Sequence, residues 1–363
     1  MPKNYRNILV INTFGIGDVL FSTPLVRALK RNIPGATIDF MCNERCQYLM
    51  DSNPNINKII VFEKDQYRNI FKKSKIGFVR EVLKFAGRIR SARYDLAVDL
   101  SLGYQISLFL KLLGVKKRIG FNYRKRGRFL TDKLDIEGFN EKHAVEYYLD
   151  ILRLISIRDV SARDIELRLN KEFDRWASGY LSKKELAGKR IIGLAPGGGR
   201  SWGKYAKYRR WSPDNFGYVA NMIKADNENS FFLIFGSKEE KHLGNVIKAH
   251  LGDNSINLCG KLSLPQSISL IKKCELLLCN DGGLLHIAVS QKVKTVSIFG
   301  PVDDNVYGPY PSNDMHKVIK AEKVHCRPCY KSFKHTTCQS HDCLKDIDTN
   351  KVFKVIEEML AKK

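Results

Sequence analysis

Short apolar runs alternate with longer stretches of mixed apolar and polar residues along the chain. The apolar runs are rich in Val, Ile, Leu and Phe, and they span residues 7–12, 36–42, 58–62, 95–100, 118–121, 190–195, 231–236, 275–279 and 295–300. The stretches between them have the spacing of amphipathic helices, most clearly at residues 19–31, 80–91, 213–225, 238–251, 264–273 and 284–290. This alternation predicts parallel sheets covered by helices, an α/β fold.

Length and polarity divide the pattern into two parts. A chain of 363 residues suggests two domains at about 150 residues each, and the polar stretch near residues 161–189 has no strong strand pattern. We predict a doubly wound N-terminal domain over 1–165, a linker over 166–189 and a doubly wound C-terminal domain over 190–363. In such sheets ligands bind beyond the carboxyl ends of the strands, so functional residues are expected in the loops that follow strands.

The first such loop contains Gly15, Gly17 and Asp18. Its two glycines allow a tight turn into the next helix, whose first N–H groups are then open to an anion. Position 20 is leucine, so a G-x-G-x-x-G motif is incomplete and a dehydrogenase is not indicated. Asp18 has two interpretations: a helix N-cap, for which aspartate is a preferred residue, or a carboxylate that accepts a proton from a substrate.

A second loop, residues 196–201, places Gly197, Gly198 and Gly199 directly after a strand. The paired Arg209 and Arg210 follow, just ahead of a helix predicted to begin with Ser212 as N-cap and Pro213 as its first residue. Glycine backbone and arginine side chains suit a phosphate group. The alternative is a flexible surface loop.

A third loop contains Asp281, Gly282 and Gly283, and it opens a predicted helix that carries His286 in its first turn. The glycines allow a diphosphate to approach the helix N-terminus, whose partial positive charge attracts anions. Taken alone, His286 is better explained as a buried core histidine, and its functional interpretation depends on the whole loop.

The charge is strongly basic, with 62 Lys and Arg against 38 Asp and Glu, a formal net charge of +24. The densest basic segments are residues 68–93 and 116–128. Such a field attracts nucleic acid, an anionic membrane surface or a phosphorylated substrate, although solvated helix faces are the alternative for either segment. No RNA-binding signature or zinc-finger spacing supports a nucleic-acid-binding protein. With no apolar run long enough to span a bilayer, a cytoplasmic protein is expected.

Four of the nine cysteines crowd into the segment 325–345, with the spacing C-x₂-C-x₈-C-x₄-C. His325, His335 and His341 lie close by. Four thiols in this pattern can bind a structural zinc or iron ion, and free or catalytic thiols are the alternative. The predicted ligands are Cys326, Cys329, Cys338 and Cys343. The other cysteines lie in apolar elements and are expected to be core residues.

Four segments resemble those of the bacterial family 9 glycosyltransferases, the lipopolysaccharide heptosyltransferases. They are ILVINTFGIGDVLFSTPLVRALKRNIPGATIDFM, PGGGRSWGKYAKYRRWSPDNF, CNDGGLLHIAVSQKVKTVSIFGPVDDNVYGPY and the tail CRPCYKSFKHTTCQSHDCLKDI. They occur in the family's order over nearly the whole chain. The resemblance implies a GT-B architecture: two Rossmann-like doubly wound domains that face each other across a cleft.

The resemblance also implies roles for individual residues. Asp18 matches the family's catalytic aspartate, the general base for the acceptor hydroxyl. Gly15 and Gly17, in the same loop, are implied to be acceptor-binding residues. The donor-binding residues implied by the matching motifs are Arg209, Asp281, Gly282, Gly283, His286, Gly198, Gly199 and Glu240. At Arg209 the family commonly has a lysine, and Phe14 and Gly15 stand where many members have serines. Lys72, Lys73 and Lys75 are the basic residues we assign to the acceptor side.

The implied reaction is an inverting transfer of heptose from ADP-heptose to the phosphorylated inner core of lipopolysaccharide, without a catalytic metal or other cofactor. The implied partners are a nucleotide sugar, a lipid-anchored phosphorylated oligosaccharide and the anionic inner face of the inner membrane, where the enzyme would be peripheral. No nucleic acid is expected, and the sequence does not fix the oligomeric state. A different sugar is an alternative. A protein acceptor is another, because heptosyltransferases that modify autotransporters are similar in carrying a cysteine-ligated iron near the C-terminus.

Overall fold

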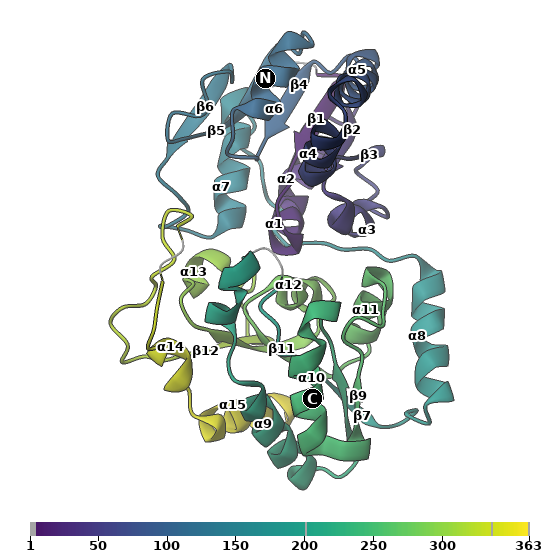
Figure 1. The fold of residues 1–363 in the computed structure, drawn as a ribbon, viewed down its shortest axis with the longest axis vertical. Helices are drawn as coiled ribbons and strands as arrows, with labels where there is room; N and C mark the ends of the chain where they lie inside the picture. The colour runs from purple at the N-terminus through teal and green to yellow at the C-terminus, as the bar shows by residue number, and fades with distance from the viewer. Residues whose placement is uncertain (1–4, 200–201, 335–336, 362–363) are drawn as a thin grey trace. The chain divides into compact units, whose positions relative to one another are not determined.

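Two compact units make up the computed structural model, which describes residues 5–199, 202–334 and 337–361 (Figure 1). The first unit holds the chain to Phe139 together with Ala144–Asp164, and the second holds Asn140–His143 together with the chain from Ile165 onward. Arg200 and Ser201 of the second glycine loop, and His335 of the cysteine segment, lie outside the described residues.

The first unit is built on a parallel sheet of six strands in the order β3-β2-β1-β4-β5-β6. Its strands are β1 (Asn7–Ile11), β2 (Thr37–Cys42), β3 (Lys58–Val61), β4 (Leu96–Asp99), β5 (Lys117–Tyr123) and β6 (Asp132–Ile136). Its helices are α1 (Ile16–Phe21), α2 (Thr23–Asn32), α3 (Gln47–Met50), α4 (Lys64–Lys73), α5 (Lys75–Ser91), α6 (Gln105–Leu112) and α7 (Ala144–Asp150). The chain leaves β1 toward one edge of the sheet and returns to β4 on its other side, the doubly wound topology.

Alternating residues of β1 explain how this sheet is covered. Leu9 and Ile11 point to one face, where they join a cluster with Phe85 and Ile89 of α5 and Leu110 of α6. The intervening Ile8 and Val10 are also fully buried. Burial of both faces is the reason that the strand reads as a continuous apolar run.

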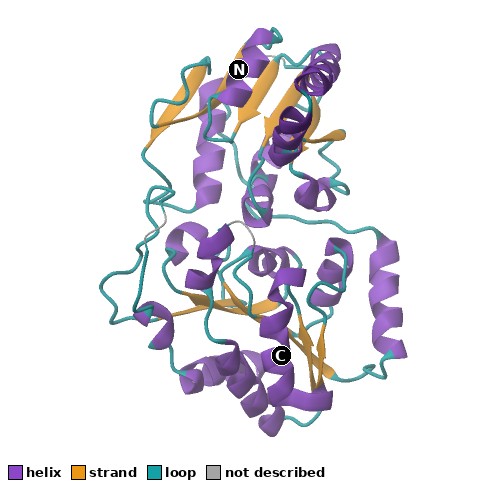
Figure 2. Cartoon of the chain, viewed as in Figure 1, coloured by secondary structure: helices purple, strands orange, loops and turns teal. Residues whose placement is uncertain are grey.

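The second unit repeats the topology, with six parallel strands in the order β12-β11-β10-β7-β8-β9 (Figure 2). Its strands are β7 (Arg190–Ala195), β8 (Ser230–Ile234), β9 (Ser255–Asn257), β10 (Leu276–Asn280), β11 (Lys294–Phe299) and β12 (His316–Lys320). Its helices are α8 (Lys171–Lys183), α9 (Pro213–Asp226), α10 (Lys241–Leu251), α11 (Leu264–Ile271), α12 (Gly283–Ser290), α13 (Asp304–Tyr307), α14 (Asp342–Lys345) and α15 (Thr349–Ala361).

The last helix of the chain is part of this unit's core. Val352, Ile356 and Met359 of α15 are at most 5% exposed, and they join one cluster with Trp211 ahead of α9 and with strand residues such as Ile192. The C-terminal helix therefore covers the sheet face that α9 and α10 also cover.

The segment expected to be a linker carries helix α8 and groups with the second unit. Asp174 of α8 forms an ion pair with Lys272 at 2.9 Å, and the Leu167 carbonyl accepts a hydrogen bond from the Gln291 side chain at 2.9 Å. The short piece Asn140–His143 also groups with this unit, where His143 Nε2 lies 3.1 Å from the Gly308 carbonyl oxygen. Through the described ranges, no helix is both long enough and apolar enough to cross a membrane.

Candidate functional site

The carboxyl ends of β7 and β10 mark the switch point of the second sheet. The two strands are parallel neighbours, and the chain leaves them toward opposite edges of the sheet. The loop after β7 begins at Pro196, and the loop after β10 begins at Asp281. Two of the three sequence-predicted loops therefore lie side by side, where doubly wound sheets bind their ligands.

Asn280, the last residue of β10, links these loops. Its Nδ2 donates to the Pro196 carbonyl at 2.7 Å, and its Oδ1 accepts from the backbone N–H of Trp211 at 3.0 Å. The side chain is buried and is hydrogen-bonded through both its nitrogen and its oxygen, so it fixes the glycine loop and the arginine segment against β10. Sequence reasoning assigned no role to Asn280, although a polar residue that ends an apolar strand could have indicated one.

Arg209 and Asp281 form a buried ion pair between these loops. Arg209 Nη2 lies 2.5 Å from Asp281 Oδ2, with the side chains 9% and 3% exposed. The guanidinium also lies over the Trp202 ring, 4.6 Å from its centre. Burial raises the pKa of the Asp281 carboxyl, and the charge and hydrogen bond of Arg209 lower it. The ion pair thus holds the Arg209 guanidinium in place beside the start of α12.

Helix α12 begins at this place with two glycines. Gly282 is its N-cap and Gly283 its first residue. The N–H groups of a first helical turn have no partner within the helix, so they are available to an anion. His286 lies in the same helix and is buried. Burial, the charge of His143 and the charge of Arg209 lower the pKa of His286 to about 3, which makes the ring neutral at physiological pH.

Glu240 holds the glycine loop after β7. Its carboxylate accepts hydrogen bonds from the N–H of Gly199 at 3.2 Å and from the N–H of Ser237 at 2.9 Å, and it pairs with Arg210 at 3.4 Å. A Cβ at Gly197 would lie 2.2 Å from Glu240 Oε1, and Gly199 has φ +72. The loop thus requires glycine at both positions, at one because of close packing and at the other because of its backbone conformation.

The helix start predicted after the arginine pair is confirmed. Ser212 is the N-cap of α9, where its hydroxyl accepts from the N–H of Asp214, and Pro213 is the first helical residue. Gly198 lies close to the other glycine loop, since a Cβ at Gly282 would meet its carbonyl carbon at 3.8 Å. The donor residues proposed from the sequence in the second unit are therefore gathered around one edge of its sheet.

Asp18 occupies the corresponding edge of the first sheet, after β1. The N-cap of α1 is Gly15, so the interpretation of Asp18 as the N-cap is wrong, and Asp18 is the third residue of the helix. Its carboxylate still accepts the Gly15 N–H at 3.3 Å. The N-cap must have an extended backbone, and Gly15 provides it three residues earlier with φ −78 and ψ 179.

Two buried asparagines hold the loop that carries Asp18. Asn12 donates to the Asp18 carbonyl at 2.9 Å and accepts from the Phe14 N–H at 3.2 Å. Asn43, at the end of β2, donates to the Phe14 carbonyl. Behind the loop lies buried Tyr148, whose pKa is raised well above its ordinary value by burial and by the charge of Asp18. The Asp18 side chain is half-buried and fixed.

Lys72, Lys73 and Lys75 lie at the junction of α4 and α5, away from the loop of Asp18 in the chain. All three side chains are exposed. The structure places them on a surface of the first unit, and no hydrogen bond joins them to Gly15, Gly17 or Asp18 within the described residues.

The four tail cysteines gather at one pocket but form no metal site. Cys326, Cys329, Cys338 and Cys343 all line a pocket that Trp202, Tyr208, Tyr330 and His341 also line. Across the described ranges, no three His, Cys, Asp or Glu side chains are placed to hold one metal ion. The prediction of a structural zinc or iron is therefore not supported. Cys343 is buried beside Leu344 in the core, and Cys338 Sγ accepts the His341 N–H at 3.4 Å.

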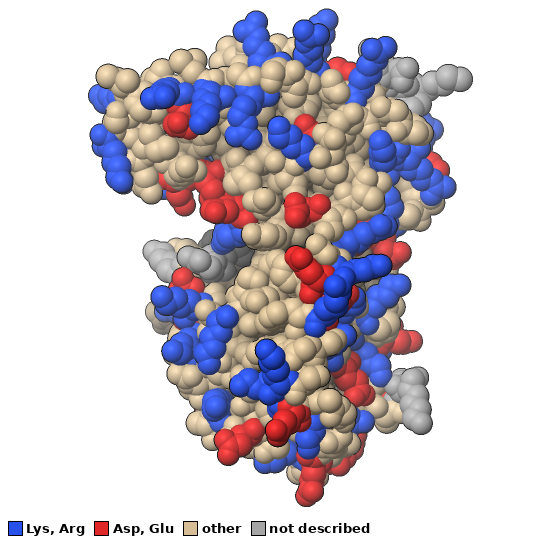
Figure 3. All heavy atoms as spheres, turned by 90° about the vertical axis from the view of Figure 1, so that its right-hand side faces the viewer, with Lys and Arg blue, Asp and Glu red and all other residues tan. Residues whose placement is uncertain are grey.

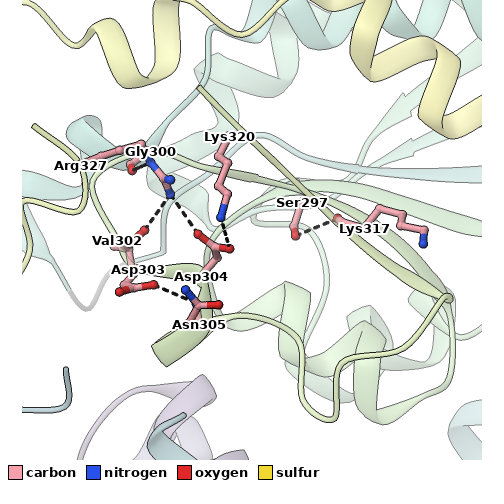
Figure 4. A network of polar contacts seen from close by, with 9 residues as sticks. All are labelled: Ser297, Gly300, Val302, Asp303, Asp304, Asn305, Lys317, Lys320 and Arg327. Carbon is pink, nitrogen blue, oxygen red and sulfur yellow. Dashed lines mark hydrogen bonds and ion pairs between the residues drawn. The ribbon is translucent and has the colours of Figure 1, made fainter. Parts of the chain in front are cut away.

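Polar contacts anchor this tail (Figure 4). Arg327 donates to the Gly300 carbonyl at 3.1 Å and pairs with Asp304 at 3.1 Å, and Lys320 pairs with the same carboxylate at 2.8 Å. The Pro301 carbonyl accepts the N–H groups of Cys329 and Tyr330, both at 3.0 Å. The tail is thereby fastened to the loop that follows β11. Its Tyr330 ring packs 4.7 Å from Trp202, which contacts Arg209.

Known proteins are similar to this chain in both sequence and fold. The model of glycosyltransferase family 9 (heptosyltransferase) matches residues 82–337. Lipooligosaccharide heptosyltransferase 2 of Campylobacter jejuni is 26% identical over 350 residues, 95% of this chain and 96% of that protein.

Two solved structures show the same architecture. A family 9 glycosyltransferase from Veillonella parvula has a TM-score of 0.83 at 22% identity, over 100% of this chain and 99% of that one. The E. coli ADP-heptose lipopolysaccharide heptosyltransferase II has a TM-score of 0.76 at 24% identity, over 98% of each chain. The paired doubly wound units are the Rossmann-like domains of the GT-B fold. The family match spans most of the chain, and the chain belongs to glycosyltransferase family 9, the heptosyltransferases.

Proposed function

We propose that this glycosyltransferase moves heptose from ADP-heptose to the phosphorylated inner core of lipopolysaccharide, with inversion at the anomeric carbon. The observation that carries the proposal is the buried Arg209–Asp281 pair at the N-terminus of α12. The names of the relatives support the sugar and the acceptor, since they include heptosyltransferases of lipopolysaccharide and one named for ADP-heptose.

In the second unit, the diphosphate of the donor would lie against the start of α12. The free N–H groups at Gly282 and Gly283 and the guanidinium of Arg209 would stabilise the charge that develops on the leaving diphosphate. Neutral His286 would donate a hydrogen bond without adding a charge. The backbone of Gly198 and Gly199 would line the sugar nucleotide, with Glu240 as the candidate ribose contact.

In the first unit, Asp18 would act as the general base. The acceptor hydroxyl must lose a proton as it attacks the anomeric carbon, and one fixed carboxylate is sufficient for this step. Gly15 and Gly17, which have no side chains, would leave room for the acceptor beside that carboxylate. Lys72, Lys73 and Lys75 would attract the phosphates of the acceptor, which is anchored in the anionic cytoplasmic face of the inner membrane.

The test separates donor binding from chemistry. Calorimetric titration with ADP, UDP and GDP, without added magnesium, is expected to show selective binding of ADP. Asp18→Asn should keep that affinity and lower kcat by about 100- to 10,000-fold. Asp51→Asn, a change of an exposed carboxylate in the same unit, is the matched control and should leave both unchanged.

Three outcomes would contradict the proposal. Preference for UDP or GDP would overturn the sugar donor, and full turnover by Asp18→Asn would remove its role as base. Transfer to a protein in place of lipopolysaccharide core would overturn the proposed acceptor.

The lysines assigned to the acceptor have a test of their own. A variant that combines Lys72→Glu, Lys73→Glu and Lys75→Glu should raise the KM for a lipid-free phosphorylated acceptor while the ADP affinity stays the same.

A further inference from the structure

Helices α4 and α5 of the first unit expose a strip of large apolar side chains. On α5, Ile76, Val79 and Leu83 are 85%, 53% and 65% exposed, and their spacing of three and four residues places them on one helix face. Phe71, near the end of α4, is 50% exposed, and its ring packs 5.2 Å from that of Phe78. Single exposed apolar residues are ordinary, but a contiguous group marks a binding surface.

Cations surround this strip. Lys72, Lys73, Lys75, Arg80 and Lys84 are all exposed, and none of them makes an ion pair within the described part of the chain. Arg80 and Lys84 directly follow Val79 and Leu83 in the helix. Between residues 66 and 94, Glu81 is the single acidic residue. Figure 3 shows Lys and Arg gathered over the upper part of the face it presents, where the first unit lies.

The two helices contribute little to the core of their unit. Helix α4 has no buried residue, and α5 buries only Phe85 and Ile89 in its second half. The first half of α5 is thus an amphipathic helix whose apolar side chains face outward. Burial within the unit does not account for Ile76, Val79 and Leu83.

We infer that this surface, the α4–α5 face, inserts into an anionic lipid bilayer at the boundary between headgroups and acyl chains. An amphipathic helix with apolar residues on one side and Lys or Arg beside them has the chemistry of an interfacial membrane anchor. The apolar side chains leave water, and the cations remain with the lipid phosphates. Pairing of this face with a second copy of the chain would instead place like charges opposite each other.

The inference rests on the proposed function only in that the acceptor is carried by a membrane, and it names the surface that contacts the lipid. It is tested without donor or acceptor. The full-length protein is sedimented with phosphatidylcholine vesicles and with vesicles that also contain phosphatidylglycerol. Binding should require phosphatidylglycerol and should weaken as salt is added.

Three variants separate the contributions. Ile76→Ser, Val79→Ser and Leu83→Ser combined should weaken vesicle binding by about tenfold or more, because their buried area is lost. Combined Arg80→Glu and Lys84→Glu should also weaken binding by about tenfold or more. Lys351→Glu with Lys354→Glu, the same charge change on exposed positions of α15, is the matched control and should bind like the original protein.

Insertion itself has an optical readout. Leu83→Trp should show a blue shift of its fluorescence when phosphatidylglycerol vesicles are added, relative to the unsubstituted protein. Tyr218→Trp, at a 53% exposed position of α9, should show none. Circular dichroism of each variant confirms that it is folded. The serine variant should keep its kcat/KM toward a lipid-free acceptor.

The inference is overturned if the serine variant binds vesicles like the original protein or if Leu83→Trp shows no shift. It is also overturned if the free protein forms dimers that the serine variant abolishes, since the face would then bind a second copy. Failure of ADP binding would refute the proposed function while leaving the vesicle result intact, so the two failures are distinguishable.

Discussion

Arg209 and Asp281 meet at 2.5 Å in the interior of the second unit, one from the segment before α9 and the other from the loop after β10. Each side chain neutralises the other where water is nearly absent. The pair therefore has two consequences: it joins two loops in the free protein, and it holds a guanidinium ready beside a helix N-terminus.

Removing both members of this pair should cost less stability than the sum of the two single removals. Arg209→Ala leaves a buried carboxylate without its cation, and we expect the free energy of unfolding to fall by about 3–5 kcal/mol. The double variant Arg209→Ala with Asp281→Ala should lose clearly less than the sum of the single losses. Urea unfolding of all four proteins measures this coupling.

The control is an exposed pair in the other unit. Arg68 and Asp65 lie 3.3 Å apart with side chains 60% and 81% exposed. Arg68→Ala should change stability by no more than about 0.5 kcal/mol. A coupling at Arg209 and Asp281 as small as that of the exposed pair would contradict the role given to burial.

Gly197→Ala should disrupt the loop after β7. The added Cβ would lie 2.2 Å from Glu240 Oε1, so the carboxylate that holds Gly199, Ser237 and Arg210 must move. We expect a loss of about 1–3 kcal/mol in stability and a marked loss of ADP affinity, measured by unfolding and calorimetry.

Gly87→Ala is the matched substitution, because a Cβ there meets no atom within 4 Å in the interior of α5. It should raise stability by about 0.5–1 kcal/mol and leave ADP affinity unchanged. Normal ADP binding by Gly197→Ala would show that the loop tolerates displacement of Glu240.

Acid should destabilise the second unit through two buried histidines. Burial lowers the pKa of His286 to about 3 and that of His316 to about 4, from an ordinary value of 6.5. As the pH falls below 6.5, the unfolded chain takes up protons that the folded chain does not, so the free energy of unfolding decreases. For His286 this amounts to about 2 kcal/mol between about pH 7 and pH 5.

His286→Gln should remove that part of the pH dependence. Urea unfolding near neutral and mildly acid pH, without nucleotide, provides the measurement. His242→Gln, at an exposed position of α10, should keep the full dependence. Equal slopes for His286→Gln and the original protein would mean that His286 is protonated in the folded state.

The nine thiols should differ in reactivity toward a disulfide reagent. Burial raises the pKa of Cys42, Cys46 and Cys259 to about 12, and Cys274 and Cys279 are buried as well, so these five should react only on unfolding. Cys326 is exposed and should react first, followed by Cys329 and Cys338. Cys343 is buried, which raises its pKa to about 11, so it should react last of the four tail thiols. Thiol counting with mass spectrometry identifies the sites. Protection of all four tail cysteines by a bound zinc or iron would contradict the side-chain arrangement of the described residues, in which these thiols do not converge on one metal position.

The central strands of both sheets were predictable because both of their faces are buried. β1, β7 and β10 read as continuous apolar runs, and the structure confirms them. The edge strand β6 alternates polar and apolar residues and β9 has three residues, so neither leaves such a run. The single helix predicted over residues 19–31 is two helices, because Ser22 lies between α1 and α2 and donates its hydroxyl to the Val19 carbonyl.

The loops of the candidate site were also visible in the sequence, since glycines directly after apolar runs indicate a backbone that approaches a ligand. The contacts between loops were not. That Asn280 holds both Pro196 and Trp211, or that Glu240 lies under Gly197, depends on which strands are neighbours. The cysteine spacing predicted a metal site that the structure does not support. Short sequence distances indicate that the thiols are near one another, but not that their sulfur atoms converge on one point.

The position of α15 in the chain means that the core of the first unit can form before the core of the second unit during synthesis. Val352, Ile356 and Met359 fill the core beside strands that were made far earlier. The first unit contains no residue beyond Asp164, so its core can close while the rest of the chain is still being made. The second unit cannot complete its core until α15 has left the ribosome, and until then its sheet exposes an apolar face. Loss of the last turns would therefore produce a chain with a folded first unit and an aggregation-prone second one.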